Sequence, residues 1–268
     1  MISTAVTGAA GRMGKMLIES ITDSEGLTLT AAFEQSGLSI IGSDAGSLVG
    51  LGDLGVLISD DIGDQVDKFD VLIDFSIPEA TTKSVAVCQE YKRALVIGTT
   101  GFSADDLDLI EAAAAEIPIV MAPNMSVGVN VVFKLLDDAA KTLGSDFDIE
   151  VIEAHHRNKI DAPSGTAVRM GEILASATNR DLADDAIYGR QGDEGPRKNN
   201  TIGFSTVRGG DIVGDHTVLF AGIAERIEIT HRAQSRSNFA QGALRAAIFA
   251  ASKDNGLYDM QDVLGLKT

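Results

Sequence analysis

A glycine-rich turn close to the N-terminus constrains the fold of this 268-residue chain more than any other feature. It reads Gly-Ala-Ala-Gly-Arg-Met-Gly over residues 8–14 and joins an apolar run, Ile2–Val6, to Met13–Ile21, where apolar residues recur four apart. The first segment predicts a strand and the second a helix. Gly8 permits a tight turn, Gly11 lets a phosphate approach the backbone, and Gly14 lets the helix pack close to the strand. This order is typical of a dinucleotide-binding α/β domain, in which the pyrophosphate lies on the helix N-terminus.

The spacing of these glycines is less specific than their context. It is G-x-x-G-x-x-G and not the commoner G-x-G-x-x-G, so the run by itself also fits a plain glycine turn. Leu27–Phe33 predicts a second strand, and Glu34 ends it, 20 residues past Gly14. An acid at this position hydrogen-bonds the ribose hydroxyl of an adenosine. The complete order of strand, turn, helix, strand and acid therefore favours a dinucleotide site over an incidental turn.

The remainder of the first 126 residues continues to alternate between strand and helix signals. Strands are expected at Val71–Phe75, Ala94–Ile97 and Ile119–Met121, and helices at Ala80–Tyr91 and at Ala104–Glu116 with Ser103 as its N-cap. Short apolar strands alternating with helices predict a Rossmann-like, doubly wound parallel sheet that is covered on both faces. Two loops follow strands at the same sheet edge, residues 98–101 (Gly-Thr-Thr-Gly) and 122–125 (Ala-Pro-Asn-Met), and both are candidates for the nicotinamide side of the site.

The pattern changes after Asn124. The segments that follow are a helix at Val129–Thr142, a strand at Phe147–Ala154, a helix at Thr166–Ala177, a polar loop at Tyr188–Asn200, strands at Thr201–Val207, Thr217–Ile223 and Glu225–His231, and a helix at Asn238–Ser252. They predict a second, α+β domain with an open mixed or mostly antiparallel sheet. Because the last helix could return to the first domain, we expect residues 1–126 and 237–268 to bind the dinucleotide. Residues 127–236 would then bind substrate and form the oligomer.

Composition limits the partners and the location of the chain. The formal net charge of −17 argues against nucleic-acid or acidic-membrane partners, and an anionic substrate would need a local cationic pocket. Cys88 is the only cysteine, so an intrachain disulfide is impossible. The N-terminus has no basic region followed by a long apolar run, and we expect neither a signal peptide nor a membrane span. These features predict a cytoplasmic protein.

The most informative stretch for chemistry covers residues 153–167, Glu-Ala-His-His-Arg-Asn-Lys-Ile-Asp-Ala-Pro-Ser-Gly-Thr-Ala. His155 can donate a proton near neutral pH, and Lys159 can stabilise negative charge that develops in a substrate. His156 is adjacent to His155 at a strand end and should face the other way, so the two have different tasks. Residues 164–166 predict a helix N-terminus that attracts carboxylates. Arg236 could complete a second carboxylate clamp, so a dicarboxylate substrate and a proton-dependent reaction are predicted.

Other interpretations of these residues are weaker. A pair of histidines can bind a metal, but there is no H-E-x-x-H and no set of cysteine ligands, so no metal is expected. A serine hydrolase is disfavoured because the chain has no G-x-S-x-G turn. His216 and His231 fall in strand-like segments and are interpreted as structural. The remaining rivals are another two-domain dehydrogenase and a non-enzymatic NAD-binding sensor. Cys88, inside a predicted helix, is badly placed as the nucleophile that a semialdehyde dehydrogenase needs.

The run at residues 153–167 resembles the signature of the bacterial dihydrodipicolinate reductase family, now called 4-hydroxy-tetrahydrodipicolinate reductases. Further segments in the family's order extend the resemblance to essentially the whole chain: residues 8–14, 74–76, 98–102, 124–130 and 201–204. The resemblance implies reduction of 4-hydroxy-tetrahydrodipicolinate to tetrahydrodipicolinate by NADH or NADPH, with loss of water, in lysine and diaminopimelate biosynthesis. It also implies a cytoplasmic homotetramer built through the sheet of the second domain.

The same resemblance implies roles for individual residues. His155 would be the proton donor, assisted by Lys159. The substrate would be held by His156, Gly165, Thr166 and Arg236. The cofactor would be contacted by Gly8, Ala9, Ala10, Gly11, Arg12, Met13, Glu34, Gly98, Thr99, Thr100, Ala122, Pro123, Asn124 and Met125.

The residues around Glu34 bear on the choice between the two cofactors. Glu34 favours the free 2′-hydroxyl of NADH, whereas a 2′-phosphate would require a cation. Gln35 is uncharged where many family members carry arginine, and Arg12 is the nearest candidate cation. We therefore expect a preference for NADH with some use of NADPH.

Overall fold

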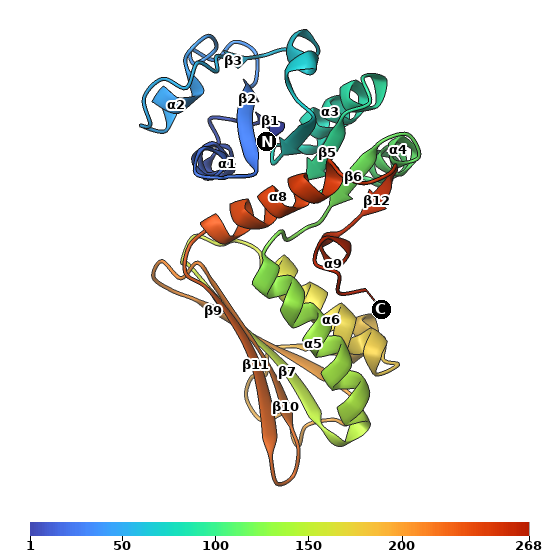
Figure 1. Ribbon diagram of the computed structural model, residues 1–268. Coiled ribbons are helices and arrows are strands. Elements are labelled where there is room, and N and C mark those ends of the chain that lie inside the picture. Colours follow the sequence, from blue (N-terminus) through green and yellow to red (C-terminus); the bar gives the residue numbers. More distant parts are fainter. Residues whose placement is uncertain (268) are drawn as a thin grey trace. The chain divides into compact units, whose positions relative to one another are not determined.

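The computed structural model describes residues 1–267 and divides into two compact units, each described here by itself (Figure 1). Unit 1 comprises Met1–Val127 together with the C-terminal segment that begins at Arg236. Unit 2 comprises Gly128–Ser235. The last long helix, α8 (Ser237–Ala250), therefore belongs to the same unit as the N-terminal glycine turn.

Unit 1 is built on a seven-stranded sheet in which every adjacent pair of strands is parallel. The order is β12-β6-β5-β4-β1-β2-β3, and the strands are β1 (Ile2–Thr7), β2 (Leu27–Phe33), β3 (Ile58–Ser59), β4 (Val71–Asp74), β5 (Ala94–Ile97), β6 (Pro118–Met121) and β12 (Gly256–Tyr258). The predicted Rossmann-like sheet is confirmed. The two edge strands, β3 and β12, were not predicted, because two or three residues are too few to show a periodic pattern.

Helices cover both faces of this sheet. One core cluster joins the sheet to α1 (Arg12–Thr22) and α8, and the other joins it to α3 (Pro78–Glu90) and α4 (Ala104–Ala114). Val71 and Ile73 belong to the first cluster and Leu72 to the second, as the two-residue period of a strand requires. Short helical turns complete the unit: α2 (Ala45–Leu48), η1 (Gly63–Lys68) and α9 (Met260–Val263).

Unit 2 contains a five-stranded mixed sheet in the order β11-β10-β7-β9-β8. The strands are β7 (Asp148–His155), β8 (Ala186–Tyr188), β9 (Ile202–Arg208), β10 (Gly214–Ala221) and β11 (Arg226–Ala233). β10 runs antiparallel to β7 and β11, whereas β9 runs parallel to β7 and β8. Of the two expected arrangements, mixed or mostly antiparallel, the sheet has the mixed one: a helix-containing crossover from β7 to β9 lets both strands run in the same direction. Tyr188, expected in a loop, ends the short strand β8.

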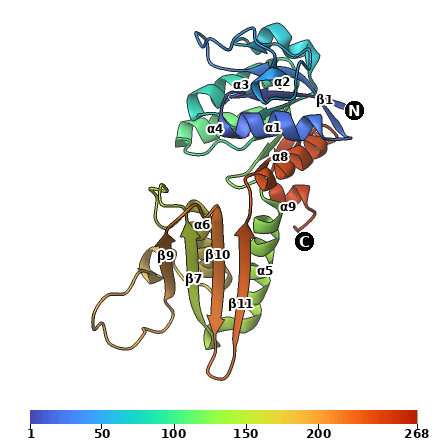
Figure 2. The same ribbon diagram turned by 90° about the vertical axis from the view of Figure 1, so that its left-hand side faces the viewer.

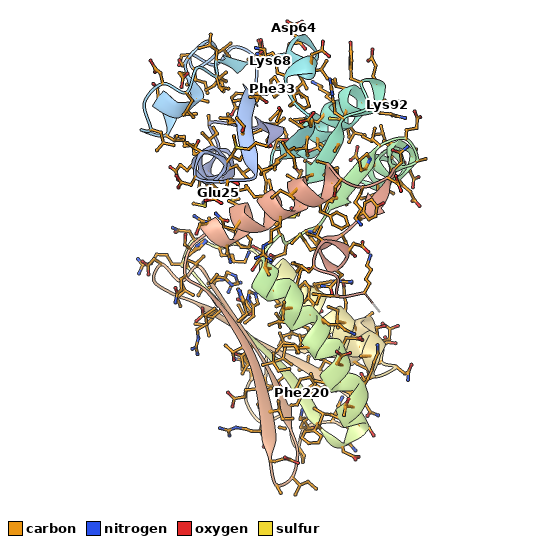
Figure 3. The ribbon with its side chains drawn as sticks, viewed as in Figure 1. Glu25, Phe33, Asp64, Lys68, Lys92 and Phe220 are labelled. Carbon is orange, nitrogen blue, oxygen red and sulfur yellow. The ribbon has the colours of Figure 1, made fainter. Side chains whose placement is uncertain are left out.

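The helices of unit 2 all belong to one side of its sheet. α5 (Val127–Leu143) and α6 (Gly165–Ala177) lie against the same face, and η2 (Gly144–Asp146) and α7 (Leu182–Asp185) are short (Figures 1 and 2). Phe220 points from the sheet toward α5 and is fully buried there (Figure 3). On the opposite face the side chains of Ile152 and Val207 remain 39% and 50% exposed. This face, which also carries Glu150 with its partners Arg190 and Arg197, is not covered by any helix of the described unit.

Candidate active site

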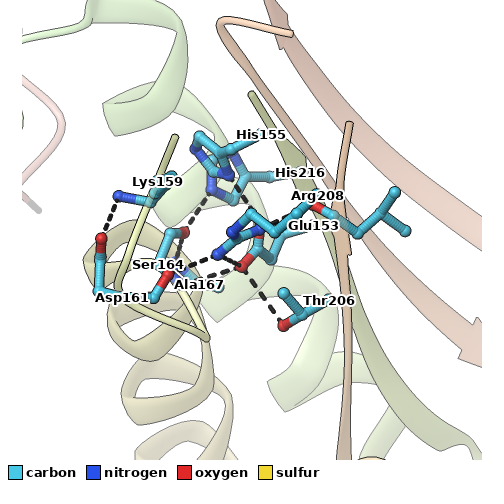
Figure 4. A network of polar contacts seen from close by, with 10 residues as sticks. Glu153, His155, Lys159, Asp161, Ser164, Ala167, Thr206, Arg208 and His216 are labelled. Atoms are coloured by element: carbon cyan, nitrogen blue, oxygen red, sulfur yellow. Dashed lines mark hydrogen bonds and ion pairs between the residues drawn. The ribbon is translucent and has the colours of Figure 1, made fainter. Parts of the chain in front are cut away.

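Glu153 and His155 form the centre of a buried polar network at the end of β7 (Figure 4). They are two residues apart, so both point to the face of the sheet that the helices cover. Glu153 is 1% exposed and His155 8%. His155 Nδ1 lies 2.6 Å from Glu153 Oε2, a distance that indicates a short, charge-assisted hydrogen bond. The sequence places His155 in the site, but it assigns no role to Glu153.

Arg208, the last residue of β9, binds the Glu153 carboxylate through two parallel hydrogen bonds. Its Nη1 and Nη2 donate to Oε2 and Oε1, each at 2.8 Å. The Ser164 amide donates to Oε1 at 3.0 Å, and the Thr206 hydroxyl adds a longer contact at 3.4 Å. Burial raises the pKa of Glu153, but the donors, led by Arg208, outweigh burial and hold this pKa below its ordinary value. Glu153 is therefore an ionised, fully partnered carboxylate.

The protonation of His155 reflects opposing influences. Burial lowers its pKa, the Glu153 carboxylate partly opposes that effect, and the positive charges of Lys159 and Arg208 lower the pKa further. The result is a pKa below the ordinary histidine value. A negatively charged group arriving beside the ring would raise it again, because an opposite charge favours the imidazolium. His155 is thus placed to take up or release a proton as the charge around it changes.

His216 of β10 lies directly against His155, although the sequence suggests only a structural role for it. The two ring centroids are 5.0 Å apart in an edge-to-face arrangement. His216 Nε2 is 2.9 Å from the Ser164 hydroxyl. Burial, followed by the charge of His155, lowers the pKa of His216 to about 4. His216 is therefore neutral near neutral pH and forms an uncharged wall beside the His155 ring.

Lys159 lies in the loop that follows β7 and is held there by Asp161. Its Nζ is 2.8 Å from Asp161 Oδ1, and its amide donates to the His156 carbonyl at 3.1 Å. Burial raises the pKa of Asp161, but the Lys159 ammonium outweighs it and keeps this pKa below the ordinary value. Arg208 Nη2 also donates to the Asp161 carbonyl, at 2.6 Å. Arg208 thereby ties the loop that carries Lys159 to the carboxylate that binds His155.

Helix α6 begins immediately after this loop. Ser164 is its N-cap and accepts from the Ala167 amide at 3.2 Å. Gly165 is exposed, and a Cβ added there would meet no atom within 4 Å. Thr166 is half-buried in the same turn. The N-terminus of a 13-residue helix, preceded by the lysine loop, is an electropositive position suited to a carboxylate.

Unit 1 brings the predicted cofactor residues to one edge of its parallel sheet. The glycine turn follows β1, Glu34 follows β2, the Gly98 loop follows β5 and the Ala122 loop follows β6. Adjacent parallel strands place these four segments at their carboxyl ends, where open α/β sheets bind ligands. Thr99 is fixed there by Asp74 Oδ1, which lies 3.2 Å from the Thr99 hydroxyl.

The glycine turn itself fits a pyrophosphate. Gly8 has φ +64°, and a Cβ on Gly14 would lie only 2.1 Å from the carbonyl oxygen of Gly8. Gly11 caps α1 without any side-chain hydrogen bond to the first turn, so no side chain competes for the amides there. Glu34 Oε2 accepts from the Ala10 amide at 2.9 Å, which fastens the acid to the turn. The turn therefore has the room that a phosphate needs, and its contact with the cofactor stays a prediction.

The structure groups the predicted substrate-side residues only in part. His155, His156, Lys159, Gly165 and Thr166 belong to unit 2, in β7, the loop after it and the first turn of α6. Arg236 is the N-cap of α8 and belongs to unit 1, so its place in the clamp stays a prediction. Residues 1–267 contain no group of three His, Cys, Asp or Glu side chains that could hold a metal ion. No helix in the same range is long and apolar enough to cross a membrane.

Five residues of the network were missed from the sequence: Glu153, Asp161, Thr206, Arg208 and His216. A signal for Glu153 exists, since an acid two residues before a histidine on a strand shares its face. Arg208 and His216 lie on other strands, 53 and 61 residues further along the chain than His155, and only the strand register brings them to His155.

A dinucleotide-type parallel sheet, together with a second unit that carries a histidine–carboxylate pair, indicates a nicotinamide-dependent oxidoreductase. The chain belongs to the dihydrodipicolinate reductase family: residues 2–125 match the family's N-terminal domain and residues 128–264 its C-terminal domain. The 4-hydroxy-tetrahydrodipicolinate reductase of Pseudomonas fluorescens is 59% identical over 264 residues, which cover 98% of each chain. The family and the reductase function that the sequence predicts are thus confirmed, and NAD(P)H binding by unit 1 follows from them.

Solved structures show the same fold. A dipicolinate-bound dihydrodipicolinate reductase from Paenisporosarcina sp. TG-14 superimposes with a TM-score of 0.78 at 23% identity, covering 98% of both chains. A scyllo-inositol dehydrogenase from Lactobacillus casei with bound NAD(H) and scyllo-inositol gives a TM-score of 0.60 at 12% identity, covering 98% of this chain and 93% of the other. At these identities the likeness concerns the fold alone.

Proposed function

We propose that His155 is the proton donor of this reductase and that Lys159 stabilises the charge developing beside it. The reaction is the reduction of 4-hydroxy-tetrahydrodipicolinate to tetrahydrodipicolinate in lysine and diaminopimelate biosynthesis. When bound, the reduced nicotinamide supplies the hydride. The single observation that carries the residue assignment is the buried Glu153–His155 pair, at 2.6 Å, beside the loop of Lys159. A histidine held in this way can protonate the ring atom that gains electron density.

The substrate residues are assigned by charge. A ring with two carboxylates needs local positive potential in a chain whose net charge is −17. Lys159 and the first turn of α6, with Gly165 and Thr166, supply it from unit 2, and we assign His156 and Arg236 to the remaining carboxylate contacts. The dipicolinate bound to the Paenisporosarcina reductase is a dicarboxylate of this kind and supports the assignment.

Binding of pyridine-2,6-dicarboxylate tests this pocket. We expect a crystal soaked with NADH and this analogue to show one carboxylate against Lys159 Nζ and the first turn of α6. Lys159→Met should raise the Kd of the analogue about 10-fold or more, because a charged hydrogen bond is lost. Lys141→Met is the matched control, since Lys141 also pairs with an aspartate, Asp137 at 2.6 Å, but on α5. An unchanged Kd in the Lys159 variant would exclude the proposed pocket.

NADH should be preferred over NADPH. Glu34 follows β2 and its carboxylate is fastened to the Ala10 amide and, through Oε1, to the Gln35 amide at 2.9 Å. A fixed negative charge accepts from a ribose hydroxyl and repels a 2′-phosphate. Steady-state kinetics with both cofactors should give a higher kcat/KM for NADH, with measurable activity for NADPH. Glu34→Gln should bring the kcat/KM values for NADH and NADPH closer together. A strong preference of the unmodified enzyme for NADPH would refute the role assigned to Glu34.

We also propose that the chain forms a homotetramer through the sheet of unit 2, as the family resemblance implies. The uncovered sheet face of unit 2, with Ile152 and Val207 partly exposed, supports an interface between copies of the chain at this sheet. We propose a cytoplasmic location and no nucleic-acid or membrane partner, because the net charge of −17 disfavours binding to polyanionic surfaces.

A further inference from the structure

We propose that Glu153, held by Arg208, is a positioning residue that fixes the tautomer of His155. The carboxylate accepts the hydrogen on Nδ1 and leaves Nε2 as the nitrogen that exchanges a proton with the substrate. This inference rests on the proposed role of His155 as proton donor and extends it to the residues behind the ring. It assigns Glu153 and Arg208 a task in the reaction although neither needs to touch the substrate.

The first step is the arrangement of donors around the carboxylate. Oε1 faces Arg208 Nη2, the Ser164 amide and the Thr206 hydroxyl, and all three are donors. Oε2 faces Arg208 Nη1 at 2.8 Å and His155 Nδ1 at 2.6 Å. An ionised carboxylate can only accept hydrogen bonds, so Nδ1 must carry the hydrogen in this contact. The neutral ring is then the Nδ1–H tautomer, and its Nε2 lone pair is free to hold the reacting proton.

The second step is the surroundings of Nε2. In residues 1–267, Glu153 is the one hydrogen-bond partner of the His155 ring, and it is at Nδ1. A Cβ added to Gly214, the first residue of β10, would lie 2.9 Å from Nε2. Glycine at this position therefore leaves the Nε2 edge of the ring unobstructed by a side chain. The neutral His216 ring packs edge-to-face against His155 and limits its rotation.

The third step is the role of Arg208 in aligning both predicted catalytic side chains. Its guanidinium holds the Glu153 carboxylate and, through Nη2, the Asp161 carbonyl at 2.6 Å. Asp161 in turn pairs with Lys159. One ion pair, between partly exposed Arg208 and buried Glu153, thus sets the orientation of His155 and the position of the loop that carries Lys159 (Figure 4).

Glu153→Gln tests the proposal because it should reverse the tautomer. At the Oε1 position the amide nitrogen would face three donors. At the Oε2 position it would face two, Arg208 Nη1 and His155 Nδ1, and the hydrogen on Nδ1 can move to Nε2, so the nitrogen should take the place of Oε2. There it donates to Nδ1, and the ring hydrogen must move to Nε2. We expect kcat to fall about 10- to 100-fold with little change in KM, because an unfavourable tautomer impairs the reaction and not binding.

The control is Glu150→Gln, the same change three residues earlier on β7. Glu150 is also bound by arginine, Arg190 at 2.8 Å and Arg197 at 3.1 Å, but it has no contact with His155. Both variants should lose similar stability, whereas kcat of the Glu150 variant should stay within about 2-fold of the unmodified enzyme. In a His155→Gln background, Glu153→Gln should have little further effect, because Glu153 acts through His155. Equal losses of kcat in the two glutamate variants would overturn the proposal.

The tautomer can also be measured without any variant and without activity. The chain has only four histidines, so nitrogen-15 spectra of labelled enzyme are assignable by comparison with the His155→Gln variant. Above the His155 pKa the neutral ring should carry its hydrogen on Nδ1, and an Nε2–H signal there would overturn the proposal even if Glu153→Gln fails to fold. Normal turnover of the His155 variant would instead reject the proton-donor role while leaving the measured tautomer intact.

Discussion

Replacing His155 by glutamine should lower kcat by about 10²- to 10⁴-fold while KM changes little, because the loss of a positioned general acid affects the transition state more than substrate binding. Glutamine retains polar atoms and approximate size but cannot donate a proton of suitable acidity. Its amide N–H can still donate a hydrogen bond to Glu153, so the buried carboxylate keeps its partner on that side. Steady-state kinetics over a range of pH is the measurement.

The pH profile identifies the group. Only the imidazolium can donate, so kcat/KM of the unmodified enzyme should fall as pH rises through the His155 pKa. Burial places that pKa below the ordinary histidine value in the free enzyme, and a bound dicarboxylate should raise it in the complex. The descending limb should therefore lie at higher pH in kcat than in kcat/KM, and it should vanish in the His155 variant.

His231→Gln is the control, since burial also lowers the pKa of His231 on β11 but His231 is outside the Glu153 network. Near-normal turnover of His155→Gln would remove this residue from the acid role.

The network around His155 also shows where sequence-based prediction stops. Thr201–Val207 and Thr217–Ile223 were expected as strands. The first interval ends one residue before Arg208, and the second begins one residue after His216. Strand ends have little sequence signal of their own, because pairing with a neighbour extends them. Arg208 is part of β9 because it pairs with His155, and His216 is part of β10 because it pairs with Glu153. The residues that complete the site are placed by the register in which β9 and β10 pair with β7. A single amino-acid sequence does not specify this register.

The parallel sheet of unit 1 was predictable because its strands are marked by local sequence patterns and do not depend on register to be recognised. Its central strands are continuous apolar runs separated by helices, so the local pattern and the tertiary arrangement agree. Ser103 was predicted as the N-cap of α4, and it forms a reciprocal capping box with Asp106. The mixed sheet of unit 2 was less predictable, because the strand-like runs after residue 200 do not reveal that β9 pairs with β7 in parallel.

Gly14→Ala should disrupt the cofactor unit itself. The new Cβ would lie 2.1 Å from the carbonyl oxygen of Gly8 and 2.8 Å from the Ala9 Cα, and both atoms are backbone. Helix α1 would have to move away from the turn, although its Leu17 and Ile18 side chains are fully buried. Overpacking of this kind costs about 1–3 kcal/mol or more, so we expect Tm to fall by roughly 5–10 °C. Dinucleotide binding, measured by NADH fluorescence, should be lost with it.

Gly11→Ala should separate the loss of thermal stability from the loss of NADH binding. Gly11 has φ −67°, which alanine adopts freely, and the added Cβ would approach only the Gly8 carbonyl oxygen, at 3.1 Å. Loss of glycine at the N-cap costs about 1 kcal/mol or less, so Tm should stay within a few degrees of the unmodified enzyme. Yet the methyl group occupies the position where a phosphate must approach the backbone, and the Kd for NADH should rise. If both alanine variants lost the same stability, the close approach of α1 to the turn would not explain the requirement for glycine at position 14.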